Sequence, residues 1–147
     1  MIIRAARPGD LEVVVALLHE DVIREVDESD VPASSYAAAF AEICGDAHQD
    51  LLVGEVVATA QLTWVRHLTY VGGLMCTIES VRVRSDLRGR GLGRELIEHV
   101  LGIARGRGAA RVELTTNAQR VRAQEFYQGL GFVASHVGMK YYLGGKQ

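Results

Sequence analysis

A glycine- and arginine-rich stretch, residues 88–93, is the part of this sequence best suited to bind a ligand. It reads Arg88-Gly89-Arg90-Gly91-Leu92-Gly93, and Arg94 follows it. The stretch joins an apolar run typical of a strand (78–83) to a run typical of a helix (92–104). Glycines at such a junction leave main-chain N–H groups open, and the helix start adds unpaired N–H groups and the positive end of its dipole. This arrangement predicts a seat for a phosphate, with the arginines adding positive charge. The alternative is a glycine-rich turn with incidental arginines.

Two well-known phosphate-binding patterns do not fit the stretch. The dinucleotide pattern G-x-G-x-x-G fails because Arg94 stands where the third glycine should be. The P-loop pattern is excluded because no lysine follows these glycines. The pattern that fits is R-x-x-G-x-G, formed by Arg88, Gly91 and Gly93.

The strand before this stretch has an irregular apolar pattern. Leu74, Cys76 and Ile78 occupy even positions, whereas Val81 and Val83 occupy odd ones. A strict period of two cannot put both sets on one face. One extra residue near Glu79-Ser80, a β-bulge, would restore a continuous apolar face and leave backbone groups unpaired. Burial of the strand on both faces is the alternative.

A second motif follows at the C-terminal side. It comprises Asn117, then Arg122-x-x-x-Phe126-Tyr127, then Leu130-Gly131-Phe132. Together with Glu-Ser-Val-Arg-Val before R-x-x-G-x-G, it resembles the GNAT superfamily of acetyl-CoA-dependent N-acetyltransferases. The resemblance covers roughly residues 50–143, and the first 50 residues match only in the order of their elements. Two motifs in the right order are far more specific than either alone.

The resemblance implies a binding site for acetyl-CoA as co-substrate. Backbone groups of Val81 and Val83 would pair with the pantetheine arm as an added strand does. Main-chain N–H groups from Arg88 to Gly93, with Arg94 nearby, would hold the pyrophosphate. The amide of Asn117 would fix the pantetheine. The implied cofactor-binding residues are Val81, Val83, Arg88, Gly89, Arg90, Gly91, Gly93, Arg94, Asn117 and Tyr127.

Two catalytic residues are predicted, Tyr127 from the resemblance and Glu79 from the chemistry of a carboxylate at the suspected bulge. Tyr127 would protonate the leaving thiolate, and the N–H of Val81 would donate to the thioester carbonyl. An acceptor amine with a pKa of about 10.4 must lose a proton before it attacks. Glu79 could remove it, directly or through water. Alternatively, Tyr127 is a core aromatic residue. Glu79, in turn, could simply face solvent or pair with Arg82.

The leading hypothesis is an N-acetyltransferase that moves acetyl directly to a primary amine, of a small molecule or peptide, in a ternary complex. A non-catalytic acyl-CoA-binding sensor is the alternative. A nucleic-acid-binding regulator is disfavoured by the net charge of −2 and the lack of a helix-turn-helix signature. The acidic segment Glu25–Asp30 supports a cationic acceptor, or is simply a solvated helix end.

The elements that would position these residues follow from periodicity. Strands are predicted at Met1–Ala6, Leu51–Val53, Val56–Val65, 74–83, Arg111–Thr116, Phe132–Ser135 and Val137–Leu143, with the first hairpin turning at Gly54-Glu55. Helices are predicted from Pro8 to Val22, and at Ser34–Cys44, Gly93–Arg105 and Gln119–Leu130. This order predicts a GNAT-like α/β (α+β) fold, with a mixed central sheet of about seven strands and about four helices on its faces.

Length and composition predict one domain. At 147 residues we expect a variable acceptor-side part (1–50), a core with the acetyl-CoA site (51–143) and a tail (144–147). No apolar run reaches the roughly 20 residues that span a bilayer, and no secretion signal is visible, so we expect a cytoplasmic protein. His67, His99 and His136 lack metal-ligand spacing, so no metal is expected.

Two further expectations concern the cysteines and the assembly. Cys44 and Cys76 are far apart and are interpreted as buried free thiols. Family habit and the apolar strand at Val137–Leu143 make a homodimer a reasonable expectation. The acceptor amine, and whether the acyl group is longer than acetyl, are not determined by the sequence.

Overall fold

The computed structural model describes residues 1–21 and 27–144. It contains two compact units, residues 1–114 and residues 115–147. The predicted α/β class is confirmed, and the assignment of the whole chain to a single domain stays a prediction.

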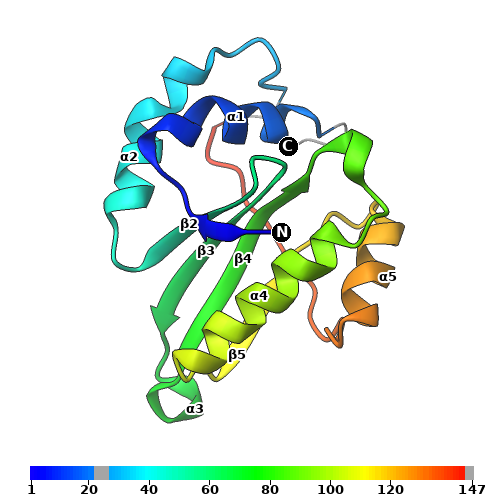
Figure 1. Ribbon diagram of the computed structural model, residues 1–147. Coiled ribbons are helices and arrows are strands. Elements are labelled where there is room, and N and C mark those ends of the chain that lie inside the picture. The colour runs from blue at the N-terminus through cyan, green and yellow to red at the C-terminus, as the bar shows by residue number, and fades with distance from the viewer. Residues whose placement is uncertain (22–26, 145–147) are drawn as a thin grey trace. The chain divides into compact units, whose positions relative to one another are not determined.

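The first unit is built on a five-stranded sheet in which sequential strands are neighbours (Figure 1). The strands are β1 (Ile3–Ala5), β2 (Gln49–Gly54), β3 (Ala58–Arg66), β4 (Leu74–Val83) and β5 (Arg111–Leu114). The first four strands pair antiparallel, whereas β4 and β5 pair in parallel. A parallel pair requires a crossover, and α4 (Leu92–Gly106) supplies it.

Helix α4 covers one face of the sheet. Its buried side chains recur at helical spacing and are Leu96, Ile97, Val100 and Ala104. The strand residues of this face are small or aliphatic, which lets the helix approach closely. They include Ala58, Ala60 and Leu62 of β3 and Cys76 and Ile78 of β4, all at most 1% exposed.

The opposite face carries α1 (Leu11–His19) and α2 (Ala37–Gly45). Each follows a short 3-10 turn, at Pro8–Asp10 and Ala33–Tyr36. A separate apolar cluster of Val14, Phe40, Leu51 and Val53 joins these helices to β2. The sheet therefore has one apolar core on each face.

Trp64 packs on the α4 side of β3. Its Nε1 donates a hydrogen bond to Asp50 Oδ2 at 2.7 Å. The guanidinium of Arg107, which follows α4, lies 4.2 Å from the centre of the indole ring and also contacts Asp50 at 2.9 Å. The indole is 3% exposed, so this cation–π pair closes the end of the core beside the C-terminus of α4.

The second unit contains α5 (Val121–Gly129) and an aromatic cluster. The Tyr127 ring makes edge contacts with Phe126 and Phe132, at 5.1 and 5.7 Å between ring centres. Gly131, with φ of 97°, reverses the chain after the helix, and the Phe132 N–H bonds the Tyr127 carbonyl at 3.1 Å.

Most predicted elements are confirmed, but two final strands are not. The described residues form five strands where about seven were expected, because Phe132–Ser135 and Val137–Leu143 have no strand assignment. Alternation of apolar residues shows which side chains could share a face, whereas a strand also requires a partner for its backbone groups. The four helices of nine or more residues are those predicted.

The first hairpin turns one residue later than predicted. Glu55 and Val56, not Gly54 and Glu55, are its central residues, with φ of 42° and 55°, and the Val57 N–H bonds the Gly54 carbonyl at 2.9 Å. Gly54 remains in β2, where a Cβ would lie 2.6 Å from the Met1 sulfur.

A buried carboxylate links β1 to the start of α1. Asp10 accepts hydrogen bonds from both terminal nitrogens of Arg4, at 2.7 and 3.0 Å, and from the Arg7 N–H at 2.7 Å. The hydrogen bond from Arg4 is the main cause of a lowered pKa at Asp10. Burial of Asp10 opposes this shift.

We expect Asp10→Asn to weaken the dependence of stability on acid pH. Because folding lowers the pKa of Asp10, its contribution is present above the ordinary value of 3.8 and is lost as the pH falls through the folded value. Urea unfolding between pH 2.5 and 6 should show that the free energy of unfolding falls less steeply with acid in Asp10→Asn than in wild type. The control Asp30→Asn, at an exposed position, should keep the wild-type slope. Equal slopes for wild type and Asp10→Asn would contradict this linkage.

Candidate functional site

The predicted β-bulge is present in β4. Glu79 lies opposite Gln61 and Arg82 lies opposite Thr59, so Ser80 and Val81 together face Ala60. Ser80 has a φ of 52°, a left-handed conformation that residues other than glycine adopt rarely. The extra residue returns Val83 to the α4 face, because its partner Ala58 packs there.

The bulge coincides with the point where β4 and β5 separate. Their ladder runs from the pair Met75–Arg111 to the pair Ile78–Leu114, where β5 ends. Beyond it, the Arg84 N–H still bonds the Val57 carbonyl of the β3 side at 2.8 Å. Because backbone groups alternate direction along a strand, Val81 and Val83 direct theirs to the opposite edge. Among the described residues of the first unit, no strand lies beside that edge.

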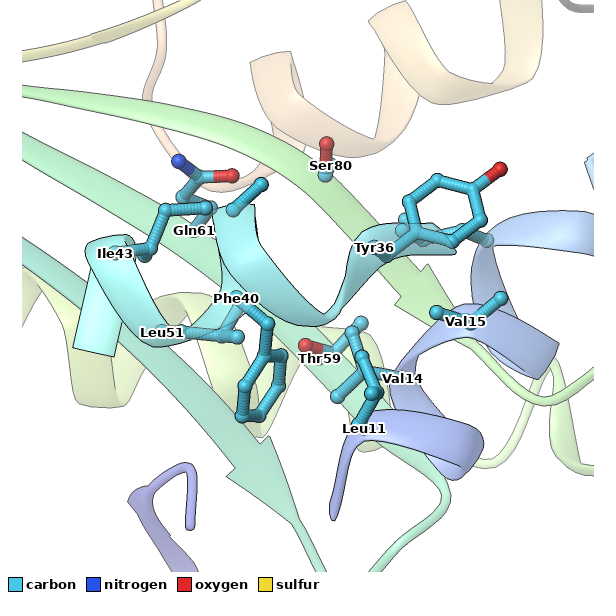
Figure 2. Close-up of a pocket in the computed structure, with 12 residues that line it drawn as sticks. Leu11, Val14, Val15, Tyr36, Phe40, Ile43, Leu51, Thr59, Gln61 and Ser80 are labelled. Carbon is cyan, nitrogen blue, oxygen red and sulfur yellow. The ribbon is translucent and has the colours of Figure 1, made fainter. Parts of the chain in front are cut away.

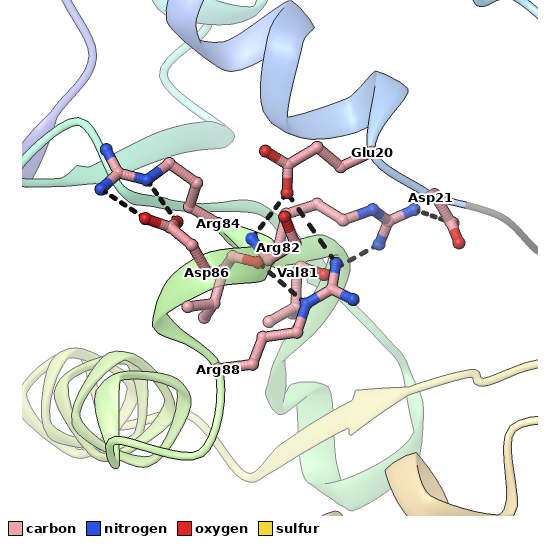
Figure 3. A network of polar contacts seen from close by, with 9 residues as sticks. Glu20, Asp21, Val81, Arg82, Arg84, Asp86 and Arg88 are labelled. Atoms are coloured by element: carbon pink, nitrogen blue, oxygen red, sulfur yellow. Dashed lines mark hydrogen bonds and ion pairs between the residues drawn. The ribbon is translucent and has the colours of Figure 1, made fainter.

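Arginine side chains bond the carbonyls of this edge (Figure 3). Arg82 Nη1 donates to the Val81 carbonyl at 2.8 Å, and Arg88 Nε donates to the Val83 carbonyl at 3.2 Å. Arg82 also contacts Asp21 at 2.6 Å, and the carboxylate of Asp21 is 7% exposed. Arg82 is therefore paired with Asp21, and the alternative of a pair between Glu79 and Arg82 stays a prediction.

The turn from β4 to α4 is tied to the end of α1. A 3-10 turn, Ser85–Leu87, follows β4, and the Ser85 N–H donates to Glu20 Oε2 at 2.7 Å. The same oxygen lies 4.0 Å from Arg88 Nη2. Arg84 and Asp86 pair at 2.7 Å within the turn (Figure 3), and this contact lowers the pKa of Asp86. The helix that covers the opposite face thus helps to hold the predicted phosphate loop.

The loop itself presents a row of main-chain N–H groups. Gly89 and Gly91 have φ of 79° and 85°, and a Cβ at either would meet nothing within 4 Å. The need for glycine here is conformational rather than steric. The first intrahelical bond of α4 is the Glu95 N–H to the Gly91 carbonyl at 3.0 Å. By helix geometry, N–H groups from Leu92 to Arg94 have no acceptor within the helix.

This donor set suits a diphosphate. Successive N–H groups at a helix start favour phosphate oxygens, and α4 is long enough to have a substantial dipole. Arg88, Arg90 and Arg94 supply nearby positive charge, although Arg94 also pairs with Glu98 at 3.3 Å. The predicted binding residues of the first unit therefore lie together on one strand, one turn and one helix start.

An apolar cavity of about 90 Å³ lies beside the bulge, between the sheet and helices α1 and α2 (Figure 2). Its aliphatic and aromatic lining includes Leu11, Val14, Val15, Phe40, Ile43 and Leu51. Gln61 and Ser80 line it on the sheet side. Glu79 is exposed and stands directly opposite Gln61 in the ladder, so its side chain belongs to the same face of the sheet.

Asn117 and Tyr127 belong to the second unit. Asn117 Oδ1 accepts a hydrogen bond from the Gln119 N–H at 2.9 Å, which organises the turn before α5. Tyr127 lies on α5 within the aromatic cluster and is partly buried, and its catalytic role and its interpretation as a core aromatic both stay predictions. The predicted site residues thus fall into two groups, one in each unit.

Several features of the site escaped prediction. The contacts of Glu20 and Asp21 with the loop and β4 join residues more than 60 positions apart, and no local pattern marks them. The cavity likewise requires α1, α2 and three strands at once.

Both cysteines are free thiols, but Cys44 is exposed, contrary to expectation, whereas burial raises the pKa of the Cys76 thiol to about 11. Of the acidic segment, residues 25–26 lie outside the described residues.

Comparison with known proteins identifies the family. The family model described as "Acetyltransferase (GNAT) family" matches residues 15–132. The chain belongs to this family. Acetyl-CoA is the family's co-substrate, and the family and the relatives support acetyl-CoA-dependent N-acetyltransferase activity in general. Within the described ranges, every helix is too short or too polar to cross a membrane.

Two curated relatives match along most of their length. The "Probable glucosamine 6-phosphate N-acetyltransferase 2" of Oryza sativa is 33% identical over 77% of this chain and 72% of its own. The streptothricin acetyltransferase of Streptomyces lavendulae is 29% identical over 88% of this chain and 79% of its own. A crystal structure described as a transcriptional regulator from Bacillus halodurans C-125 is 42% identical, covers 97% of this chain and 99% of that one, and has a TM-score of 0.88.

We expect Gly91→Ala to weaken coenzyme A binding about tenfold. An L side chain disfavours the left-handed conformation by roughly 1–2 kcal/mol, so fewer molecules present the loop in its binding form. Calorimetric titration with coenzyme A measures the effect. Gly102→Ala, at an open position within the same helix, should leave the dissociation constant unchanged. Wild-type affinity in Gly91→Ala would contradict the assignment of the loop.

Proposed function

We propose that this protein transfers the acetyl group of acetyl-CoA directly to a primary amine, with both substrates bound at once. The observation that carries the proposal is the continuity of residues 79–94, where an open strand edge leads straight into a phosphate-binding turn. Acetyl-CoA supplies the activated acetyl group as a thioester. The residues of this chain bind it, orient it and move the protons.

Binding uses main-chain groups. Val81 and Val83 offer their outward N–H and C=O groups to the pantetheine arm, as a sheet edge does to an added strand. The carbonyls become available when Arg82 and Arg88 release them. The N–H groups of the turn from Arg88 to Gly93 hold the pyrophosphate, with Arg94 beside them. The amide of Asn117 also contacts the arm in this proposal.

Catalysis uses three groups. The Val81 N–H donates to the thioester carbonyl, where negative charge develops as the amine attacks. Glu79 takes a proton from the acceptor amine, directly or through water. Its exposed position on the face that carries the cavity supports this role. Tyr127 donates a proton to the departing thiolate.

A non-catalytic acyl-CoA sensor is the second candidate. The description of a 42%-identical structure as a transcriptional regulator favours it. Such a protein would use the loop and the open edge for binding alone. Release of free thiol from acetyl-CoA across an amine panel separates the two candidates, because a sensor binds coenzyme A and releases none.

We further propose a cytoplasmic location, one acetyltransferase domain over residues 1–147 and a homodimer. The balanced charge of the sequence supports partners other than nucleic acid or membrane. Size-exclusion chromatography with light scattering measures the assembly directly.

We expect Tyr127→Phe to lower kcat about a hundredfold, because loss of a positioned acid typically costs 10²–10⁴-fold. The ring contacts with Phe126 and Phe132 do not use the hydroxyl, so this packing should be retained in the variant, and we expect coenzyme A affinity to be unchanged. Steady-state thiol release gives kcat, and calorimetry gives affinity. Tyr141→Phe, in the same unit, should match wild type. An unchanged kcat in Tyr127→Phe removes the proposed acid.

We expect Glu79→Gln to produce a kcat/KM deficit that shrinks as the pH rises. At pH 7 the amine depends on a base, whereas near pH 9.5 a growing fraction is already deprotonated in solution. The ratio of wild-type to variant kcat/KM should fall at least fivefold between these pH values. Glu12→Gln, exposed on α1, should show a constant ratio near one. A deficit that does not change with pH would mark Glu79 as structural.

A further inference from the structure

The cavity beside the bulge has an uncharged lining, and three of its polar side chains already make polar contacts. The Thr59 hydroxyl donates to the Leu52 carbonyl at 2.8 Å. Gln61 Nε2 donates to Gln49 Oε1 at 3.0 Å, and the Tyr36 hydroxyl lies 3.4 Å from His19 Nε2. A charged or strongly polar ligand group would lose its water there and find little replacement. The lining instead suits an aliphatic group.

The cavity runs from the bulge in β4 toward the core. Ser80, the bulge residue with a φ of 52°, is exposed and lines the cavity. It is next to Glu79 and Val81 in the chain. Ala39 of α2 is also exposed and lines the cavity, so the cavity reaches solvent. Phe40 and Leu51 are each 8% exposed and bound the inner part (Figure 2). A molecule held with its amine at Glu79 would direct its other end inward.

The volume sets the size of the group. A cavity of about 90 Å³ is smaller than the roughly 150 Å³ engineered cavity that binds benzene. It therefore suits a short aliphatic group better than an aromatic ring.

We propose that this cavity is the specificity pocket for the acceptor, and that the acceptor is a primary amine bearing a short aliphatic group. The inference rests on the proposed function, because it assumes that the amine reacts at the bulge. It opposes the cationic acceptor suggested by the acidic segment. Within the described residues of that segment, Asp27 accepts hydrogen bonds from the Ser29 N–H and hydroxyl at 3.0 and 2.7 Å.

An amine panel tests the chemistry of the pocket. Isoamylamine should exceed ethanolamine and 1,4-diaminobutane in kcat/KM by on the order of 50-fold, at about fourfold for each of three buried carbons. Benzylamine should be as poor as ethanolamine. Equal or better turnover of 1,4-diaminobutane would overturn the proposal in favour of a cationic acceptor.

Two alanines on one helix provide a matched pair of variants. Ala39→Phe fills the cavity from its mouth, whereas Ala38→Phe adds the same ring to α2 at an exposed position that does not line it. Ala39→Phe should lower kcat/KM for isoamylamine at least tenfold and leave methylamine within twofold. Ala38→Phe should leave both within twofold. Equal effects of the two variants on isoamylamine would overturn the proposal.

Binding without turnover separates this inference from the proposed function. In methyl-labelled protein without acetyl-CoA, isoamylamine should shift the Val14 and Val15 resonances saturably in wild type and Ala38→Phe, but not in Ala39→Phe. Absence of these shifts in wild type overturns the pocket. If the shifts occur but calorimetry detects no coenzyme A binding, the proposed function fails while the pocket stands.

Discussion

One extra residue in β4 determines how the surrounding chain can act. Ser80 interrupts the ladder with β3, and the ladder with β5 ends two residues earlier at Ile78. The strand continues beyond that point, and its outward groups pair with no strand among the described residues of the first unit. The strained φ at Ser80 is held by regular pairing on both sides of it, toward Ala58 in one direction and Leu62 in the other. A local backbone cost thus creates an edge that a ligand can use.

The electrostatics of the phosphate turn depend more on the backbone than on net charge. Arg82, Arg84, Arg88 and Arg94 each lie within 4.0 Å of a carboxylate of the same chain. Much of their charge is therefore already balanced, in keeping with an overall charge of −2. The N–H groups of the left-handed glycines and of the first turn of α4 have no such competitors among the contacts described. Recognition of an anion by fixed dipoles costs little reorganisation when the ligand binds.

Sequence periodicity predicts the elements that have strong local causes. The change of parity between Ile78 and Val81 indicates the bulge from the amino-acid pattern alone, because a two-residue period leaves no other way to keep one apolar face. Periodicity fails where pairing partners decide the outcome, as in the final segment Val137–Leu143. It also misses contacts between distant segments, such as Glu20 with Ser85, since these depend on tertiary approach. The cavity arises only after helices and strands have packed together.

The indole environment at the far end of β3 has a practical consequence. Trp64 is the single tryptophan of the chain, and it lies five residues from Thr59, or about 17 Å at the rise of a strand. Its intrinsic fluorescence therefore monitors opening of the α4 core, where Arg107 covers the ring, while events at the bulge leave the emission unaltered. The molecule carries its own optical reporter of unfolding, spatially separated from the region that handles ligands.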